Sequence, residues 1–104
     1  MKLWVDDIRT PPSDDWLWAR SVNQAITAIK WYDRSFATDT IYISLDHDAG
    51  DFGADGGDYV RVLDWLEQAG IVDTGYFFHL HTQNPVGREN MERIIRKNGW
   101  RLVK

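Results

Sequence analysis

The clearest strand in the sequence reads Thr40-Ile41-Tyr42-Ile43-Ser44-Leu45-Asp46. Residues that are β-branched or aromatic dominate it, which is typical of a strand buried in a sheet. The apolar run stops at Asp46, and residues 47–57 beyond it are rich in Gly and Asp, which indicates a long loop. The segment therefore predicts a buried strand whose carboxyl end carries an acidic side chain.

Two other short apolar runs end in polar residues in the same way. The first is Leu3-Trp4-Val5, which stops at Asp6-Asp7, and the second covers residues 75–81 and ends at His81-Thr82. In open parallel sheets, ligands bind beyond the carboxyl ends of the strands. We therefore expect three strand ends to bring their polar side chains to one rim of the sheet.

Helical patterns separate these strands. Ser21 is a good N-cap for a helix that runs to about residue 34, residues 59–69 form a second amphipathic segment, and Pro85 suits the first turn of a third helix that ends near Asn98-Gly99. Short strands are predicted at residues 16–19 and 100–103. Strands that alternate with helices predict an α/β fold with a five-stranded, mostly parallel sheet and right-handed crossovers.

Length and composition fit one small globular domain. The chain has 104 residues, of which 43% are hydrophobic and six are Trp, so we expect a single domain over residues 1–104. The absence of Cys excludes disulfides and thiolate metal sites. A net charge of −4 argues against duplex DNA as a partner, and no apolar run is long enough to cross a membrane. The expected location is the cytoplasm.

The sequence resembles the receiver domains of bacterial response regulators over nearly its whole length. Leu3-Trp4-Val5-Asp6-Asp7 is similar to their first strand and acidic pair, and the strand that ends at Asp46 is similar to the one that carries their phosphoacceptor. Asp55-Gly56 resembles the pair that opens the following helix. The resemblance also implies that Thr82 is the switch hydroxyl and that Lys104 is the phosphate-binding lysine.

Several departures from ordinary receivers narrow the resemblance. The segment before residue 16 is too short and Pro-rich for a full first helix, and no final helix follows residue 103. Instead, the chain contains Leu45-Asp46-His47-Asp48 and a segment from His81 to Met91 that resemble the cyclic-phosphate processing receiver domains. The resemblance implies a receiver-like (flavodoxin-like) three-layer sandwich, with the first and last receiver helices reduced or absent, that handles a cyclic phosphate.

The acidic residues at the strand ends predict a metal site. Nearby carboxylates repel one another, and a cation between them relieves the repulsion. Asp6, Asp7 and Asp46 supply hard oxygen ligands of the kind that Mg²⁺ or Mn²⁺ prefers, and Asp48 is a possible fourth ligand. The alternatives are that one of the first two aspartates caps a turn, and that Asp48 is a solvated turn residue.

Two histidines are candidates for proton transfer, because the ordinary pKa of His lies near neutrality. His81 lies at the rim, and His47 follows Asp46 directly. Two histidines could serve a phosphodiester by taking a proton from water and giving one to the leaving oxygen. The alternative is that both only hold loops, and His79 is expected to be a core histidine.

The start of the third predicted helix could hold an anion, because a helix N-terminus presents free N–H groups and partial positive charge. This segment runs from Asn84 to Arg88, and the guanidinium of Arg88 could bind a phosphate. The alternative for Arg88 is an ion pair with Glu92.

These features lead to three hypotheses. The first is a metal-dependent enzyme that binds and hydrolyses a cyclic or diester phosphate on a nucleotide or RNA end. The second is a module that binds a nucleotide phosphate without turnover. The third is a single-domain receiver that is phosphorylated on Asp46. The sequence does not separate the first two, because holding and cleaving a phosphate require the same residue types.

Overall fold

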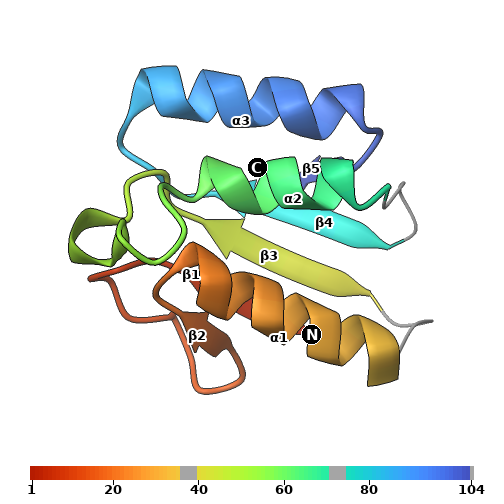
Figure 1. Cartoon of the computed structure of the whole chain (residues 1–104), viewed down its shortest axis with the longest axis horizontal. Helices are drawn as coiled ribbons and strands as arrows, with labels where there is room; N and C mark the ends of the chain where they lie inside the picture. The colour runs from red at the N-terminus through yellow and green to blue at the C-terminus, as the bar shows by residue number, and fades with distance from the viewer. Residues whose placement is uncertain (36–39, 71–74, 104) are drawn as a thin grey trace.

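A computed structural model of the chain describes residues 1–35, 40–70 and 75–103. The elements follow the order expected from the sequence (Figure 1). They are β1 (Lys2–Val5), β2 (Leu17–Ala19), α1 (Val22–Ser35), β3 (Ile41–Leu45), a 3-10 turn η1 (Gly50–Phe52), α2 (Val60–Gln68), β4 (Tyr76–Leu80), α3 (Pro85–Lys97) and β5 (Arg101–Val103).

The five strands form one sheet in the order β2-β1-β3-β4-β5, and every pair is parallel. This is the flavodoxin-like strand order, so the predicted α/β class and receiver-like topology are confirmed. The register places Trp4 beside Ser44, and Ser44 beside His79. Residues that are partners across parallel strands point to the same face of the sheet. This register therefore brings side chains of β1, β3 and β4 together on one face.

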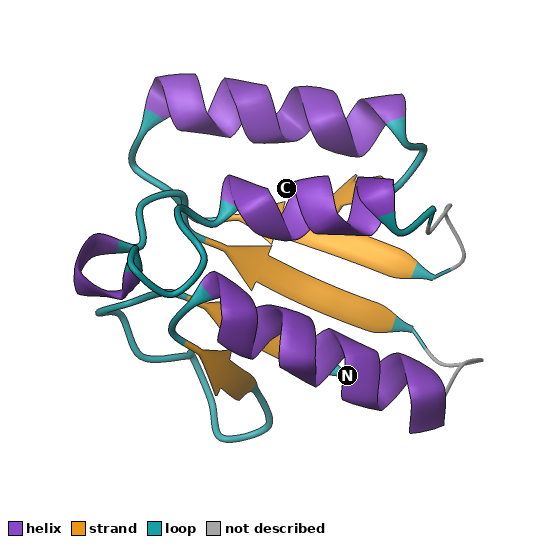
Figure 2. Cartoon of the chain, in the orientation of Figure 1, coloured by secondary structure: helices purple, strands orange, loops and turns teal. Residues whose placement is uncertain are grey.

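All three helices lie over the same face of the sheet (Figures 1 and 2). The connections through α1, α2 and α3 all run in the same direction across the sheet. Right-handed crossovers that run in one direction place their helices on the same face of the sheet. The segment between β1 and β2 crosses in the opposite direction. The described helices leave the other face of the sheet uncovered, so the described residues form two layers instead of the expected three.

The hydrophobic core lies between the sheet and these helices. Fully buried side chains alternate along β1, β3 and β4, and they pack against the inward stripes of the helices; the largest are Tyr59, Phe78, Leu3, Ile29, Ile43, Leu45, Leu63, Leu66, Met91 and Ile95. On the opposite face, Trp16 packs edge-on against both Trp4 and Tyr42. The segment between β1 and β2 thereby covers part of the face that lacks helices.

The predicted element boundaries agree with the structure to within about one or two residues. Ser21 caps α1 by accepting a hydrogen bond from the backbone N–H of Gln24, and Asn84 caps α3 by accepting one from the N–H of Gly87. The 3-10 turn η1 was not predicted. Over the described residues, none of the helices is both long enough and apolar enough to cross a membrane.

Candidate functional site

The carboxyl ends of β1, β3 and β4 form one rim, at the left in Figure 1. The sheet ladder continues one residue past each strand. The backbone N–H of Asp46 donates to the carbonyl of Val5 at 2.9 Å, and the N–H of His81 donates to the carbonyl of Leu45 at 3.0 Å. These bonds fix Asp46 and His81 beside the end of β1, where Asp6 and Asp7 follow.

Three carboxylates meet at this rim. One oxygen each from Asp6, Asp7 and Asp46 lies within 4.8 Å of the other two, and the first two residues are buried. Gly50, at a φ of +54°, allows the loop to approach closely, because a Cβ there would lie 2.3 Å from Asp7 Oδ2. The three oxygen donors fit a small hard cation such as Mg²⁺ or Mn²⁺.

The carboxylates differ in their electrostatics. Burial raises the pKa of Asp7, and the negative charges of Asp6 and Asp46 add to this rise. Burial alone would also raise the pKa of Asp6. Hydrogen bonds from the backbone N–H groups of Ile8 and Arg9 to Asp6 Oδ1 outweigh it and, together with His81, hold that pKa below its ordinary value. Asp6 is therefore ionised and held in place, whereas the repulsion between the carboxylates acts on Asp7.

His81 is engaged through both ring nitrogens. Its Nε2 lies 2.9 Å from Asp6 Oδ2, and its Nδ1 lies 2.8 Å from Ser44 Oγ. Ser44 Oγ also lies 3.0 Å from His79 Nδ1. Burial lowers the pKa of His81 despite the attraction of Asp6. A neutral His81 that donates from Nε2 and accepts at Nδ1 satisfies every partner, with Ser44 donating to His81 and accepting from His79.

Three residues that support Asp6 and His81 were not predicted from the sequence. Ser44 bridges the two histidines, the Trp4 ring stacks on His81 with centroids 4.0 Å apart, and Arg9 Nη1 donates to the His81 carbonyl at 2.9 Å. The only sequence signal for this contact was a Ser within the apolar run of β3. The role of that Ser depends on the strand register, which the sequence does not determine.

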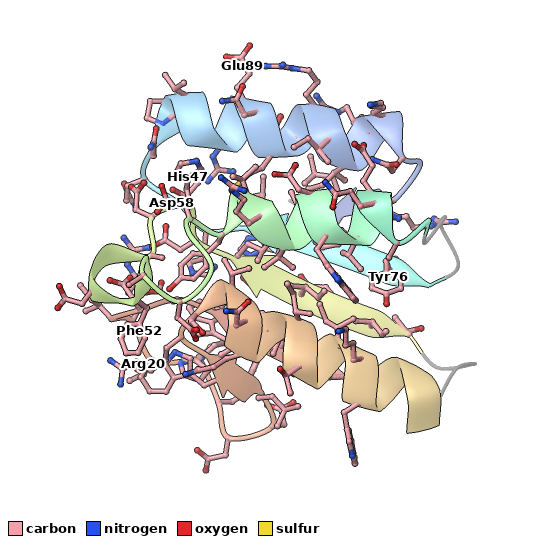
Figure 3. All side chains as sticks on the ribbon, viewed as in Figure 1. Arg20, His47, Phe52, Asp58, Tyr76 and Glu89 are labelled. Atoms are coloured by element: carbon pink, nitrogen blue, oxygen red, sulfur yellow. The ribbon has the colours of Figure 1, made fainter. Side chains whose placement is uncertain are left out.

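His47 belongs to a second group of polar side chains. Its Nδ1 lies 2.8 Å from Asp48 Oδ1, and Asp58 lies close enough for the three to share an ion. In Figure 3, His47 and Asp58 lie at the end of the molecule where α2 and α3 begin. We expected Asp48 to lie with the other metal ligands. The geometry instead groups it with His47, because Asp48 is paired with the imidazole of that residue.

The loop after β3 is closed by hydrogen bonds that explain this second group. The backbone N–H of Tyr59 donates to the His47 carbonyl at 2.9 Å, and the N–H of Ala49 donates to Asp58 Oδ1 at 3.0 Å. The His47 ring rests on α3 at Gly87, where a Cβ would lie 2.4 Å from its Cδ2 atom. Asp58 is exposed, and its Oδ1 fastens this loop by accepting from Ala49.

The start of α3 uses most of its N–H groups within the protein. Asn84 accepts from Gly87, Arg88 donates its N–H to the Asn84 carbonyl, and Pro85 has none. Thr82 Oγ1 accepts from the Asn84 N–H and keeps its own proton for donation. The expected set of free donors at this helix start is therefore reduced.

Arg88 lies beside the ends of β4 and β5. Its Nη2 donates to the Thr82 carbonyl at 3.1 Å, and it lines a cavity of about 300 Å³ together with His79. The ion pair of Glu92 is with Arg96, at 3.4 Å, so among the described residues Arg88 has guanidinium N–H groups that no protein acceptor uses. The predicted role of Lys104 lies outside the described residues.

Comparison with known proteins gives one match. A family model described as a cyclic-phosphate processing receiver domain matches residues 1–97 of the chain. No curated protein and no solved structure shows a significant match. The match covers all three carboxylates, both rim histidines and the start of α3.

Proposed function

Because the chain belongs to the cyclic-phosphate processing receiver domain family, we propose that it binds and hydrolyses a cyclic or diester phosphate on a nucleotide or an RNA end, and that this activity needs Mg²⁺ or Mn²⁺. The observation that carries the proposal is the cluster of Asp6, Asp7 and Asp46, whose ligand atoms lie within 4.8 Å of one another. Three carboxylates in such proximity, two of them buried, favour an oxygen-ligated cation.

The cation would be held by these three aspartates. A divalent ion in such a site supplies a positive charge that stabilises the negative charge developing on the phosphoryl oxygens. Asp6 is the most firmly oriented of the three, because backbone N–H groups hold its Oδ1 and His81 holds its Oδ2. Asp46 accepts from the His47 N–H through Oδ1, which leaves its Oδ2 as a ligand.

His47 is the better candidate for proton transfer. Asp48 binds its Nδ1, and a carboxylate at one ring nitrogen fixes the tautomer that leaves Nε2 to act as base. His81 has both ring nitrogens engaged within the protein. We therefore assign His47 the catalytic role and His81 the positioning of Asp6.

The reaction can be written with these groups. A water oxygen bonds to phosphorus, and His47 Nε2 takes the proton that this water loses. One P–O ester bond of the ring breaks, and the departing oxygen receives a proton from the same imidazolium or from solvent. A phosphomonoester results. The hydroxyl of Thr82 and the unused N–H groups of Arg88 are the groups that we propose hold the non-reacting phosphate oxygens.

A panel assay tests this function. The protein is incubated with 2′,3′-cyclic and 3′,5′-cyclic nucleotides and with RNA that ends in a cyclic phosphate, in Mg²⁺, Mn²⁺ or EDTA, and the products are identified by mass. We expect metal-dependent opening of at least one cyclic ester by the wild type and none by Asp46→Asn. Asp64→Asn, a change on α2, is the matched control and should retain activity. Binding of a ligand without any product would favour the non-catalytic module.

A further inference from the structure

Arg20 joins two segments of the rim, although the proposed chemistry does not use it. The residue directly follows β2, and its guanidinium carbon lies 4.8 Å from the centre of the Trp18 ring and 4.9 Å from that of Phe52. Trp18 belongs to β2 and Phe52 ends the 3-10 turn η1, so one cation contacts aromatic rings of both segments. Figure 3 shows Arg20 and Phe52 next to each other at the rim end of the molecule.

The hydrogen bonds of the same guanidinium fasten the backbone at the end of β1. Arg20 Nε and Nη2 donate to the carbonyl of Asp7 at 3.1 and 2.7 Å. Two N–H groups of one rigid fork fix the direction of the side chain as well as its distance from the carbonyl. Asp7 is one of the three carboxylates of the rim, so Arg20 reaches the carboxylate cluster through the main chain.

The main chain of Arg20 is held as well. Its carbonyl accepts from the hydroxyl of the fully buried Tyr59 at 2.7 Å, and its N–H donates to Gln24 Oε1 at 2.8 Å. Tyr59 directly precedes α2, and Gln24 lies in the first turn of α1. The guanidinium of Arg20 therefore extends from a position that two helices define.

The turn that carries Phe52 also touches the carboxylate of Asp7. Gly50 lies so close that a Cβ there would be 2.3 Å from Asp7 Oδ2. The N–H of Phe52 donates to the Ala49 carbonyl at 2.9 Å, so Gly50 lies inside one hydrogen-bonded turn with Phe52. A movement of Phe52 away from Arg20 would therefore also move Gly50 relative to the Asp7 carboxylate.

We infer that Arg20 is a positioning residue of the carboxylate site: it clamps the turn η1 on Asp7 and thereby sets where the Asp7 carboxylate lies for a divalent cation. The inference rests on the proposed function, in which that cation binds the three aspartates. Backbone N–H groups already orient Asp6, and the clamp gives Asp7 a comparable restraint. The role needs an arginine, because an ammonium group has neither the paired N–H groups nor the planar face of a guanidinium.

Amide hydrogen exchange in EDTA tests the clamp without metal or substrate. Arg20→Gln removes the cation, and Phe52→Leu removes only the ring that the cation contacts. In both variants we expect the backbone N–H of Phe52 or Leu at this position to exchange roughly two- to thirtyfold faster than in the wild type, the range for loss of a cation–π contact. Arg20→Lys should lie between the wild type and Arg20→Gln. Circular dichroism checks that each variant is folded.

The affinity for Mg²⁺, measured by isothermal titration, tests the positioning role. Arg20→Gln should weaken it roughly 10- to 100-fold, as for loss of a group that orients a metal ligand, and Arg20→Lys should recover part of the loss. By charge alone, removal of a cation near the site would strengthen Mg²⁺ binding, so a weaker affinity reports on position. Lys30→Gln is the matched control, because it removes one positive charge and a cation–π contact with Trp65 between α1 and α2. It should keep wild-type exchange and affinity.

The two measurements separate this inference from the proposed function. Unchanged exchange in Arg20→Gln would show that Arg20 does not clamp the turn, and faster exchange with unchanged or tighter Mg²⁺ binding would show that the clamp does not position Asp7. Either result overturns the inference, and so do equal effects of Arg20→Gln and Lys30→Gln. A wild type that binds no divalent cation overturns the metal requirement of the proposed function, whereas the exchange rates still decide whether Arg20 clamps the turn.

Discussion

His81 Nε2 lies 2.9 Å from Asp6 Oδ2, and the opposite ring nitrogen lies 2.8 Å from Ser44 Oγ. This contact joins the end of β4 to the end of β1 across the intervening strand β3. The Trp4 ring also stacks on one face of this imidazole. A ring held at both nitrogens and on one face orients its carboxylate partner, as the residues that surround metal ligands do.

Replacing His81 should therefore alter metal binding more than turnover. His81→Ala is expected to weaken the affinity for Mg²⁺ roughly 10- to 100-fold, the usual cost of losing a group that orients a ligand. His81→Gln should recover part of the loss, because its amide can still donate to Asp6. Isothermal titration with Mg²⁺, followed by kcat at saturating metal, measures both effects. Normal metal affinity with a lost kcat in His81→Gln would mean that His81 itself moves protons.

The stability of the metal-free protein should depend on pH through the same residue. Burial lowers the pKa of folded His81 below its ordinary value of 6.5. As the pH falls below about 6.5, the unfolded chain therefore takes up the proton first, and the free energy of unfolding decreases until the folded pKa is reached. Urea unfolding in EDTA between pH 7.5 and 5.5 should show this decrease in the wild type.

His81→Gln provides the reference, since glutamine does not titrate and the other titratable groups are common to both proteins. Its pH dependence over the same interval should be flatter than that of the wild type. Parallel curves for the two proteins would show that His81 does not carry the effect.

The proposed metal site predicts a change in thermal stability. A divalent cation at ten times its dissociation constant stabilises the folded state by about 1.4 kcal/mol, which raises the Tm of a domain of this size by roughly 6–11 °C. Asp46→Asn should remove most of this shift, and it should also raise the metal-free Tm because one repelling charge is gone. Differential scanning calorimetry with and without Mg²⁺ measures both. A shift of wild-type size in Asp46→Asn would place the cation elsewhere.

Gly87 gives a test of the His47 position. An added Cβ would lie 2.4 Å from Cδ2 of the His47 ring, so Gly87→Ala must displace the imidazole from Asp48. We expect kcat to fall about 10²- to 10⁴-fold, as for loss of a general acid–base group, with a similar fall in His47→Gln. Circular dichroism should show α3 intact, since Ala is the better helix former. Unchanged kcat in both variants would exclude His47 from the chemistry.

Much of this arrangement could be predicted because each strand stops at a polar residue. Asp6, Asp46 and His81 follow directly after apolar runs, and parallel strands place such residues on one rim whatever the strand order. The contact between Ser44 and the two histidines could not be predicted, since it requires the register that pairs Ser44 with His79. A shift of one residue would turn every side chain of β3 to the other face.

The loop that follows β3 shows a second limit. Asp48 is expected among the metal ligands because it lies only two residues beyond Asp46. Its partner in the structure is His47, and this pairing is set by the closure of the loop, in which the N–H of Tyr59 donates to the His47 carbonyl. Sequence spacing does not determine where a loop rich in Gly directs its side chains.

The most direct test of metal-dependent hydrolysis uses water labelled with heavy oxygen. The wild type is incubated in this water with Mg²⁺ and the cyclic phosphate that reacts best in the panel, and the product and the protein are both examined by mass spectrometry. The proposed function predicts a phosphomonoester that carries one heavy oxygen, no product in EDTA, and no phosphoryl group on the protein. An intact cyclic ester in the presence of bound metal, or a phosphoryl group retained on Asp46, would contradict it.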